Sequence, residues 1–180
     1  MSKISQQEKA LKGMAGEFLV AGELNRRRIH AAVTYGSSKR ADVFAFAPAS
    51  DRLARIEVKS MTLGNKKWVL SQKVLDRDNW SAYVFWVLVL LPEPHPATAT
   101  TSDEIRGSHA PRFFIFSAKE IGEHVTELHE NYVRGFRERH GREFKGPGVL
   151  QIPRDDAQAY ENKWNKIQEF LEFEKKGGLS

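Results

Sequence analysis

Two charged residues inside one predicted strand are the part of the sequence best suited to chemistry. Glu57 and Lys59 lie in the run Arg55–Ser60 (RIEVKS), separated by Val58. Side chains alternate between the two faces of a strand, so Glu57 and Lys59 share a face while Val58 and Ile56 point to the other. A half-buried strand more often carries a single polar residue at such a place, and the pair therefore needs an explanation.

A second carboxylate, Asp42, comes just before the preceding predicted strand. Residues 41–47 and 53–60 are β-runs joined by a short polar link, which predicts a hairpin. If its turn is centred between Ala49 and Ser50, residues equally distant from that centre pair, and Asp42 falls opposite Glu57. Opposed residues have Cβ atoms about 4.5–5.5 Å apart. Two carboxylates this close raise the pKa of one of them unless a cation lies between, and a divalent metal would resolve the conflict. A slip of one residue would send the two carboxylates to opposite faces.

The residue types exclude several other chemistries. The chain has no cysteine, which removes disulfides, thiolate metal sites and cysteine nucleophiles. Its six histidines lack the helical spacing of a zinc site, and neither a phosphate-binding loop ending in Lys-Ser or Lys-Thr nor a Gly-x-Ser-x-Gly elbow occurs. Carboxylate oxygens favour Mg²⁺ or Mn²⁺. The alternative, an exposed ion pair of Lys59 with one carboxylate, is worth at most about 1 kcal/mol and leaves the second carboxylate unexplained.

The first predicted helix, from about Ser5 to Arg28, carries one more candidate acid. Its apolar residues recur at three-to-four spacing, and its glycines at positions 13, 16 and 22 indicate close packing against a neighbouring backbone. Glu17 sits beside the apolar stripe, where its carboxylate could look along the edge of a sheet. A solvated glutamate on the helix face is the alternative.

Two basic groups are candidate phosphate contacts. They are Arg26, Arg27 and Arg28 at the end of the helix, and Ser37, Ser38, Lys39 and Arg40 in the loop after the next short strand. Cations, hydroxyls and backbone amides all suit phosphate oxygens. Solvated connections of this composition are the alternative reading.

Further elements follow from periodicity and capping signals. We expect a short helix from Ser71 to about Asn79, a central strand over 83–90, a strand over 112–116, a long helix from Ser117 with a capping box at Glu120, and a final amphipathic helix from Asp155 or Asp156. Residues 92–111 are rich in Pro, Thr and Ala, which predicts a mobile loop.

The totals fit one domain. The 180 residues divide into a catalytic half at 1–91, the loop at 92–111, and a completing strand with C-terminal helices at 112–180. A net charge of +5 gives a modest bias toward polyanionic partners. No secretory leader or membrane-spanning run is recognisable, so we expect a cytoplasmic protein without a membrane partner.

The ordered set of helix glutamate, strand aspartate, hairpin and Glu-Val-Lys-Ser resembles the PD-(D/E)XK nuclease superfamily. Within it, the chain looks most like the small Holliday-junction-resolvase-like and homing-type endonucleases, over about residues 13–73, with Ala41 in place of the proline of the name. The resemblance implies an α/β fold with a restriction-endonuclease-like αβββαβ core. We expect a central mixed sheet of four to five strands, helix 1 on one face, later helices on the other, and C-terminal helices.

The resemblance also implies roles for individual residues. Asp42 and Glu57 would hold Mg²⁺ or Mn²⁺ together with the backbone carbonyl of Val58, and Glu17 would support the ion, directly or through water. Lys59 would orient or deprotonate the attacking water and offset charge on the phosphate.

The implied activity is metal-dependent endonucleolytic hydrolysis of DNA. Gln72 resembles in placement a glutamine that some branches of the superfamily use near the site, with a solvated residue as the alternative. RNA stays open as substrate, and a homodimer stays open because paired cuts need two sites. The competing hypothesis is a catalytically inactive nucleic-acid-binding or interaction protein that keeps the fold.

Overall fold

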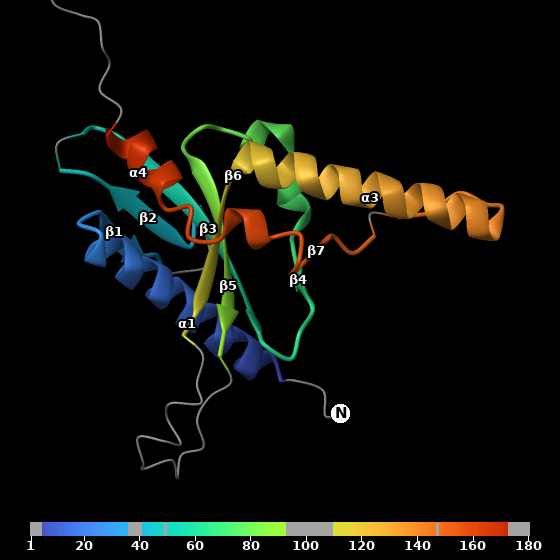
Figure 1. Ribbon diagram of the computed structural model, residues 1–180, viewed down its shortest axis with the longest axis horizontal. Helices are drawn as coiled ribbons and strands as arrows, with labels where there is room; N and C mark the ends of the chain where they lie inside the picture. Colours follow the sequence, from blue (N-terminus) through green and yellow to red (C-terminus); the bar gives the residue numbers. More distant parts are fainter. Residues whose placement is uncertain (1–4, 36–40, 49, 93–109, 147, 173–180) are drawn as a thin grey trace, which may run out of the picture.

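The computed structural model describes residues 5–35, 41–48, 50–92, 110–146 and 148–172, and its centre is a five-stranded mixed sheet. The strand order is β1-β2-β3-β5-β6, with β3 and β5 parallel and the other neighbours antiparallel (Figure 1). The bounds are β1 His30–Val33, β2 Val43–Phe46, β3 Leu53–Thr62, β5 Val84–Leu91 and β6 Arg112–Ser117. The predicted α/β class and mixed sheet are confirmed.

The remaining elements lie around this sheet. They are the helices α1 Gln6–Arg26, α3 Ala118–His140 and α4 Asn165–Glu172, the 3₁₀ turns η1 Gln72–Leu75, η2 Arg77–Asn79 and η3 Gln158–Tyr160, and the strands β4 Lys67–Val69 and β7 Gln151–Pro153, which pair with each other. No helix in these described ranges has both the length and the apolar character that crossing a bilayer requires.

Helix α1 covers one face of the sheet. It begins at a capping box in which the Ser5 side chain and Glu8 satisfy each other's backbone N–H groups. Val20 and Leu24, four residues apart on one stripe, are fully buried against Ile56 and Val58 of β3. At Gly16 the helix passes so close to β3 that no side chain fits. The close packing predicted from the glycines is confirmed there and is wrong at positions 13 and 22, which meet nothing within 4 Å.

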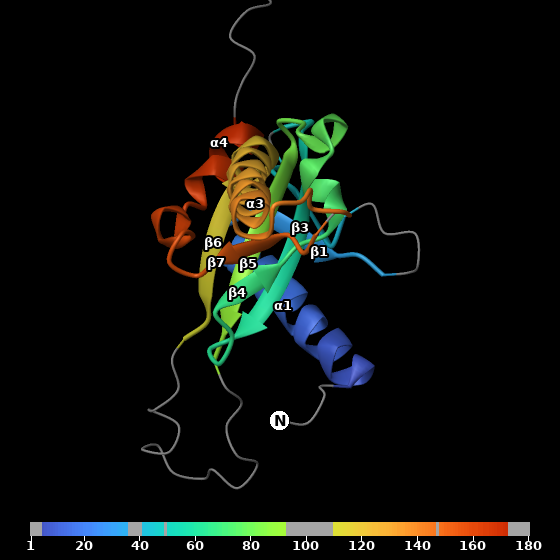
Figure 2. The same cartoon turned by 90° about the vertical axis from the view of Figure 1, so that its right-hand side faces the viewer.

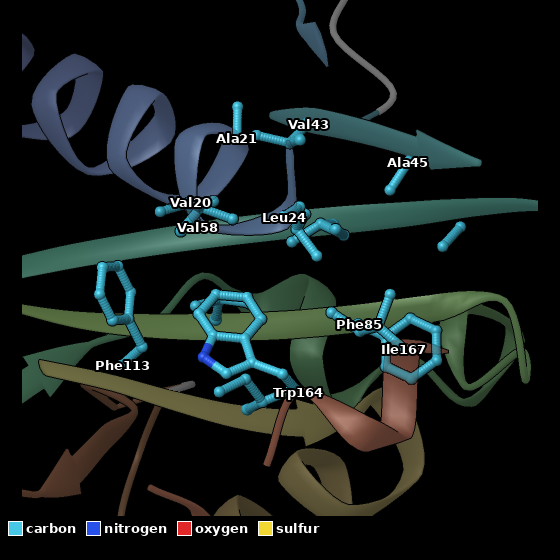
Figure 3. Close-up of a cluster of buried hydrophobic side chains, with 14 of the residues drawn as sticks. Val20, Ala21, Leu24, Val43, Ala45, Val58, Phe85, Phe113, Trp164 and Ile167 are labelled. Atoms are coloured by element: carbon cyan, nitrogen blue, oxygen red, sulfur yellow. The ribbon is translucent and has the colours of Figure 1, made fainter. Parts of the chain in front are cut away.

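Helix α4 lies on the same face as α1, so the expectation that the later helices all cover the other face is wrong for α4. Trp164, Ile167 and Leu171 join the apolar cluster of α1, and Figure 3 shows Trp164 and Ile167 beside Phe113 and Phe85. The apolar side chains of α4 pack on this face, because α3 and the β4–β7 pair cover the other one.

The final helix also begins later than predicted. Asn162 has a positive φ of 55° and donates its backbone N–H to the Phe113 carbonyl at 2.9 Å. Arg112 holds Glu161 in an ion pair at 2.7 Å. Together these contacts tie the segment before α4 to strand β6, so that only η3 forms there and the helix begins at Asn165.

Helix α3 and the β4–β7 pair cover the second face. The predicted capping box of Ser117 and Glu120 is confirmed, and the helix ends at Gly141 with φ 63°, as glycine allows. Figure 2 views α3 nearly along its axis beside β4 and β7, and in Figure 1 it extends well past the sheet. Strand β5 is buried along its whole length between the two layers, as predicted.

The segment predicted as one helix from Ser71 to Asn79 is instead two 3₁₀ turns. Ser71 makes no side-chain capping bond. Asp76 ends the first turn and caps the second, because its carboxylate accepts hydrogen bonds from Asp78 N at 3.1 Å and Asn79 Nδ2 at 2.8 Å. The chain therefore bends at Asp76 rather than continuing as an α-helix.

Gly16→Ala should destabilise the protein by about 1–3 kcal/mol, because the new Cβ would lie 1.9 Å from Ser60 Oγ and 3.2 Å from Ser60 Cβ, so that Ser60 or the helix must shift. Gly13→Ala is the matched control, since it should gain up to about 1 kcal/mol of helix propensity. Urea unfolding of both variants measures the difference. Equal stabilities would contradict the close approach of α1 to β3.

Candidate active site

The β2–β3 ladder ends next to Asp42 and Glu57. Its last pair is Val43–Ile56, and the Asp42 backbone N–H, one residue before that pair, also donates to the Ile56 carbonyl at 3.0 Å. Val43 and Ile56 are fully buried toward α1. The pairs of this ladder have the register predicted from the hairpin turn, which is confirmed. Asp42 lies just beyond the last pair, close enough for its charge to act on the Glu57 carboxyl.

Strands β2 and β3 separate at this point. In the described part of the chain, residues 53–56 are the only part of β3 that pairs with β2. Strand β3 then continues to Thr62 beside β5. One Asp42 oxygen, Oδ2, accepts a hydrogen bond from Val58 N at 2.7 Å. The N–H and C=O of a strand residue point to the same side, so the Val58 carbonyl also faces this open edge. The Asp42 carboxylate and the Val58 carbonyl thus lie where the strands part, next to Glu57, and we call the place formed by Asp42, Glu57 and Val58 the fork.

Glu57 is half-buried and carries the clearest electrostatic perturbation near the fork. Burial raises the pKa of its carboxyl above the ordinary value, and the neighbouring Asp42 raises it further. Lys73, Lys59 and Arg55 act in the opposite direction without cancelling the rise in pKa. An ionised Glu57 is therefore unfavourable as the chain stands, and an additional cation beside it would relieve the cost.

Lys59 extends the same face of β3. It lies two residues beyond Glu57, half-buried, where β3 runs beside β5. Alternate residues of a strand are about 6.6–6.8 Å apart, so the Lys59 ammonium can reach an anion held near the two carboxylates. Glu57 and Lys59 therefore share a face of β3, as predicted, and Asp42 lies beside them beyond the end of the β2–β3 ladder.

Glu17 does not join this group directly. Its neighbour Gly16 packs on Ser60 and Val58 from the α1 side, whereas Glu57 and Lys59 point away from α1. In the described part of the chain, no three His, Asp or Glu side chains gather closely enough to hold a metal ion. Support of a metal by Glu17, directly or through water, stays a prediction.

Gln72 turns away from the carboxylates. Its Nε2 donates to the Gly148 carbonyl at 3.5 Å, on the side of η1 that faces the segment before β7. Successive residues of a 3₁₀ turn point about 120° apart, so the next residue, Lys73, faces the Glu57 side instead. The structure brings Lys73, rather than the predicted Gln72, to the site.

A cavity of about 350 Å³ adjoins Glu57, and sequence reasoning did not identify it. Besides Glu57, its polar lining comprises Arg55, Lys73, Asp76 and Asn79. Arg55 could have been found, because it shares the face of Glu57 at period two. The other three come from η1, from η2 and from Asp76 between them, and the path of this segment over the sheet carries no periodic signal in the sequence.

The arginine trio lies away from the fork. The β1–β2 ladder runs from the His30–Phe46 pair to the Val33–Val43 pair and is about 10 Å long. The trio comes before the first pair, whereas Asp42 lies beyond the last one, so the ladder separates them. Arg26 and Arg27 both pair with Glu23, and the Arg27 guanidinium lies over the Trp164 ring at 4.8 Å. Their predicted phosphate contacts stay untested.

The other predicted phosphate contacts, Ser37, Ser38, Lys39 and Arg40, lie outside the described residues, as does nearly all of the loop predicted at 92–111. Comparisons with known proteins add no assignment, since no protein-family model matches the chain and no curated protein matches it significantly.

Glu57→Gln should raise the melting temperature by a few degrees at pH 7 in EDTA. The folded-state pKa of Glu57 is raised, so its ionised form costs stability above that pKa, and neutral glutamine removes the cost. The gain should disappear as the pH falls through the folded pKa toward the unfolded one, because Glu57 itself becomes neutral. Thermal melts across this pH range measure the effect.

The matched control is Glu127→Gln, at an exposed position of α3, which should leave the melting temperature unchanged. A lower melting temperature for Glu57→Gln at pH 7 would contradict the electrostatic description of the fork.

Proposed function

We propose that the chain is a divalent-metal-dependent endonuclease that hydrolyses phosphodiester bonds in DNA, with the restriction-endonuclease-like topology of the PD-(D/E)XK superfamily. The observation that carries the proposal is that Asp42, bonded to Val58 N, lies beside Glu57 where β2 leaves β3, with Lys59 on the same face of β3 as Glu57. The element order supports it: α1 is followed by three antiparallel strands and then by β5 parallel to β3. Strand β4 and two 3₁₀ turns replace the helix expected between β3 and β5.

The residues at the fork suit Mg²⁺ or Mn²⁺. Both ions prefer oxygen donors, and Asp42, Glu57 and the Val58 carbonyl supply them at an edge that no strand covers in the described residues. The raised pKa of Glu57 is a second sign of fit, because it marks a surplus of negative charge that a cation would neutralise. When bound, such an ion acidifies water and polarises a phosphoryl oxygen.

The chain's own groups would do the rest. Asp42 is held in place by the Val58 N–H, so one of its oxygens is oriented before any ligand arrives. Lys59 would position or deprotonate the water and stabilise the charge that develops on the phosphate during in-line displacement. The strands of the sheet fix both positions, and such preorganisation favours catalysis over adjustable binding.

The carboxylates favour an enzyme over a protein that only binds nucleic acid. Affinity for nucleic acid comes mainly from cations that neutralise phosphates. Asp42 and Glu57 at the centre of the candidate site would oppose such binding, whereas a metal-dependent hydrolase needs them. The proposal therefore includes catalysis.

Purified protein should cut labelled DNA in Mg²⁺ or Mn²⁺ and not in EDTA, with duplex, branched and single-stranded DNA and RNA compared side by side. Asp42→Asn keeps the shape of the side chain but removes its charge, and it should reduce cleavage to background. Lys59→Ala should lower the cleavage rate on the order of 100–1,000-fold through lost charge stabilisation.

The control is Asp51→Asn, which removes one exposed carboxylate from the β2–β3 connection and should leave cleavage unchanged. Binding without cutting in every metal and on every substrate would refute catalysis and favour a non-catalytic binding protein.

A further inference from the structure

The face of β3 that carries Glu57 has a cation on each side of it. Arg55, Glu57 and Lys59 alternate along the strand, so their side chains leave the same face in a row. Arg55 and Lys59 are four residues apart, which corresponds to about 13 Å. A nucleic-acid strand that approached Glu57 would therefore meet a cation on each side of this carboxylate.

Lys73 adds a second cation at the Arg55 end of this row. It lines the same cavity as Arg55 and Glu57, but comes from η1, a turn that crosses over the sheet. The turn is anchored by the buried Val74, whose carbonyl accepts a hydrogen bond from Trp80 Nε1 at 2.9 Å. The Lys73 side chain is itself exposed. A fixed backbone therefore presents a flexible, solvated ammonium group beside Glu57.

Asp76, the acid nearest to Lys73 in sequence, holds η2 in place, since its two oxygens accept hydrogen bonds from Asp78 N and Asn79 Nδ2. The charge of Lys73 acts on Glu57, the other acid of the cavity. The proposed metal would neutralise Glu57, and the Lys73 ammonium would then be available to another anion.

We propose that this cavity is a second phosphate subsite, in which Lys73 binds a backbone phosphate next to the one that is cut. The inference rests on the proposed function and adds a direction to it: the nucleic-acid strand runs along β3, across Glu57, from Lys59 toward Arg55 and Lys73. One strand of B-DNA carries a charge about every 3.4 Å of helix axis, so a row of about 13 Å spans the cut phosphate and its neighbours.

The test measures affinity rather than cleavage. In a Glu57→Gln background and in EDTA, binding of a fluorescein-labelled DNA duplex is titrated at several salt concentrations. Lys73→Gln should lower the slope of log affinity against log salt by about 0.9, the value for one lost phosphate contact in duplex DNA, and Lys73→Arg should restore the slope. Lys163→Gln, at an exposed position before α4, is the matched control and should change nothing.

The outcomes separate the two proposals. If the Glu57→Gln protein does not bind the duplex at any salt concentration, the subsite is refuted, and the proposed function is decided separately by the metal-dependent cleavage assay. If it binds, but Lys73→Gln leaves the slope unchanged or alters it no more than Lys163→Gln, the subsite alone is refuted. A drop of about 0.9 confined to Lys73→Gln and reversed in Lys73→Arg supports a specific phosphate contact.

Discussion

The like charges of Asp42 and Glu57 are held close together by the strands that carry them. The β2–β3 register brings them together, and the fully buried Val43 and Ile56 fix that register, since a slip of one residue would send the two carboxylates to opposite faces. The Val58 N–H then fixes one oxygen of Asp42 in place. Stability elsewhere in the core thus maintains a locally unfavourable charge pair, which is typical of functional sites.

The two layers of the fold support this pair from opposite sides. Helices α1 and α4 bury the face of Ile56 and Val58 and keep β3 rigid, with Gly16 allowing α1 to approach closely. On the other face, η1 and η2 fold over the start of β3 and help to bury Glu57, which raises its pKa. The result is a half-buried acid beside an open strand edge and cations within reach.

Local signals predicted much of this arrangement and tertiary packing decided the rest. The hairpin register followed from its turn, α3 from its capping box, and β5 from its unbroken apolar run. The face taken by α4, the bend at Asp76 and the approach of Lys73 to Glu57 could not be predicted, because contacts between distant segments decide them; the Arg112–Glu161 ion pair is one example. Gln72 was predicted from spacing along the chain, but a 3₁₀ turn directs its neighbour to the site instead.

Calorimetric titration of the metal-free protein with Mn²⁺ asks whether the fork binds a cation, and it needs no nucleic-acid substrate. We expect saturable binding, at a site containing Asp42 and Glu57, that is lost in Asp42→Asn and in Glu57→Gln and kept in Asp51→Asn. Failure of the wild-type protein to bind Mn²⁺, or equal binding by all four proteins, would contradict the account and leave the two carboxylates as an unexplained like-charge pair.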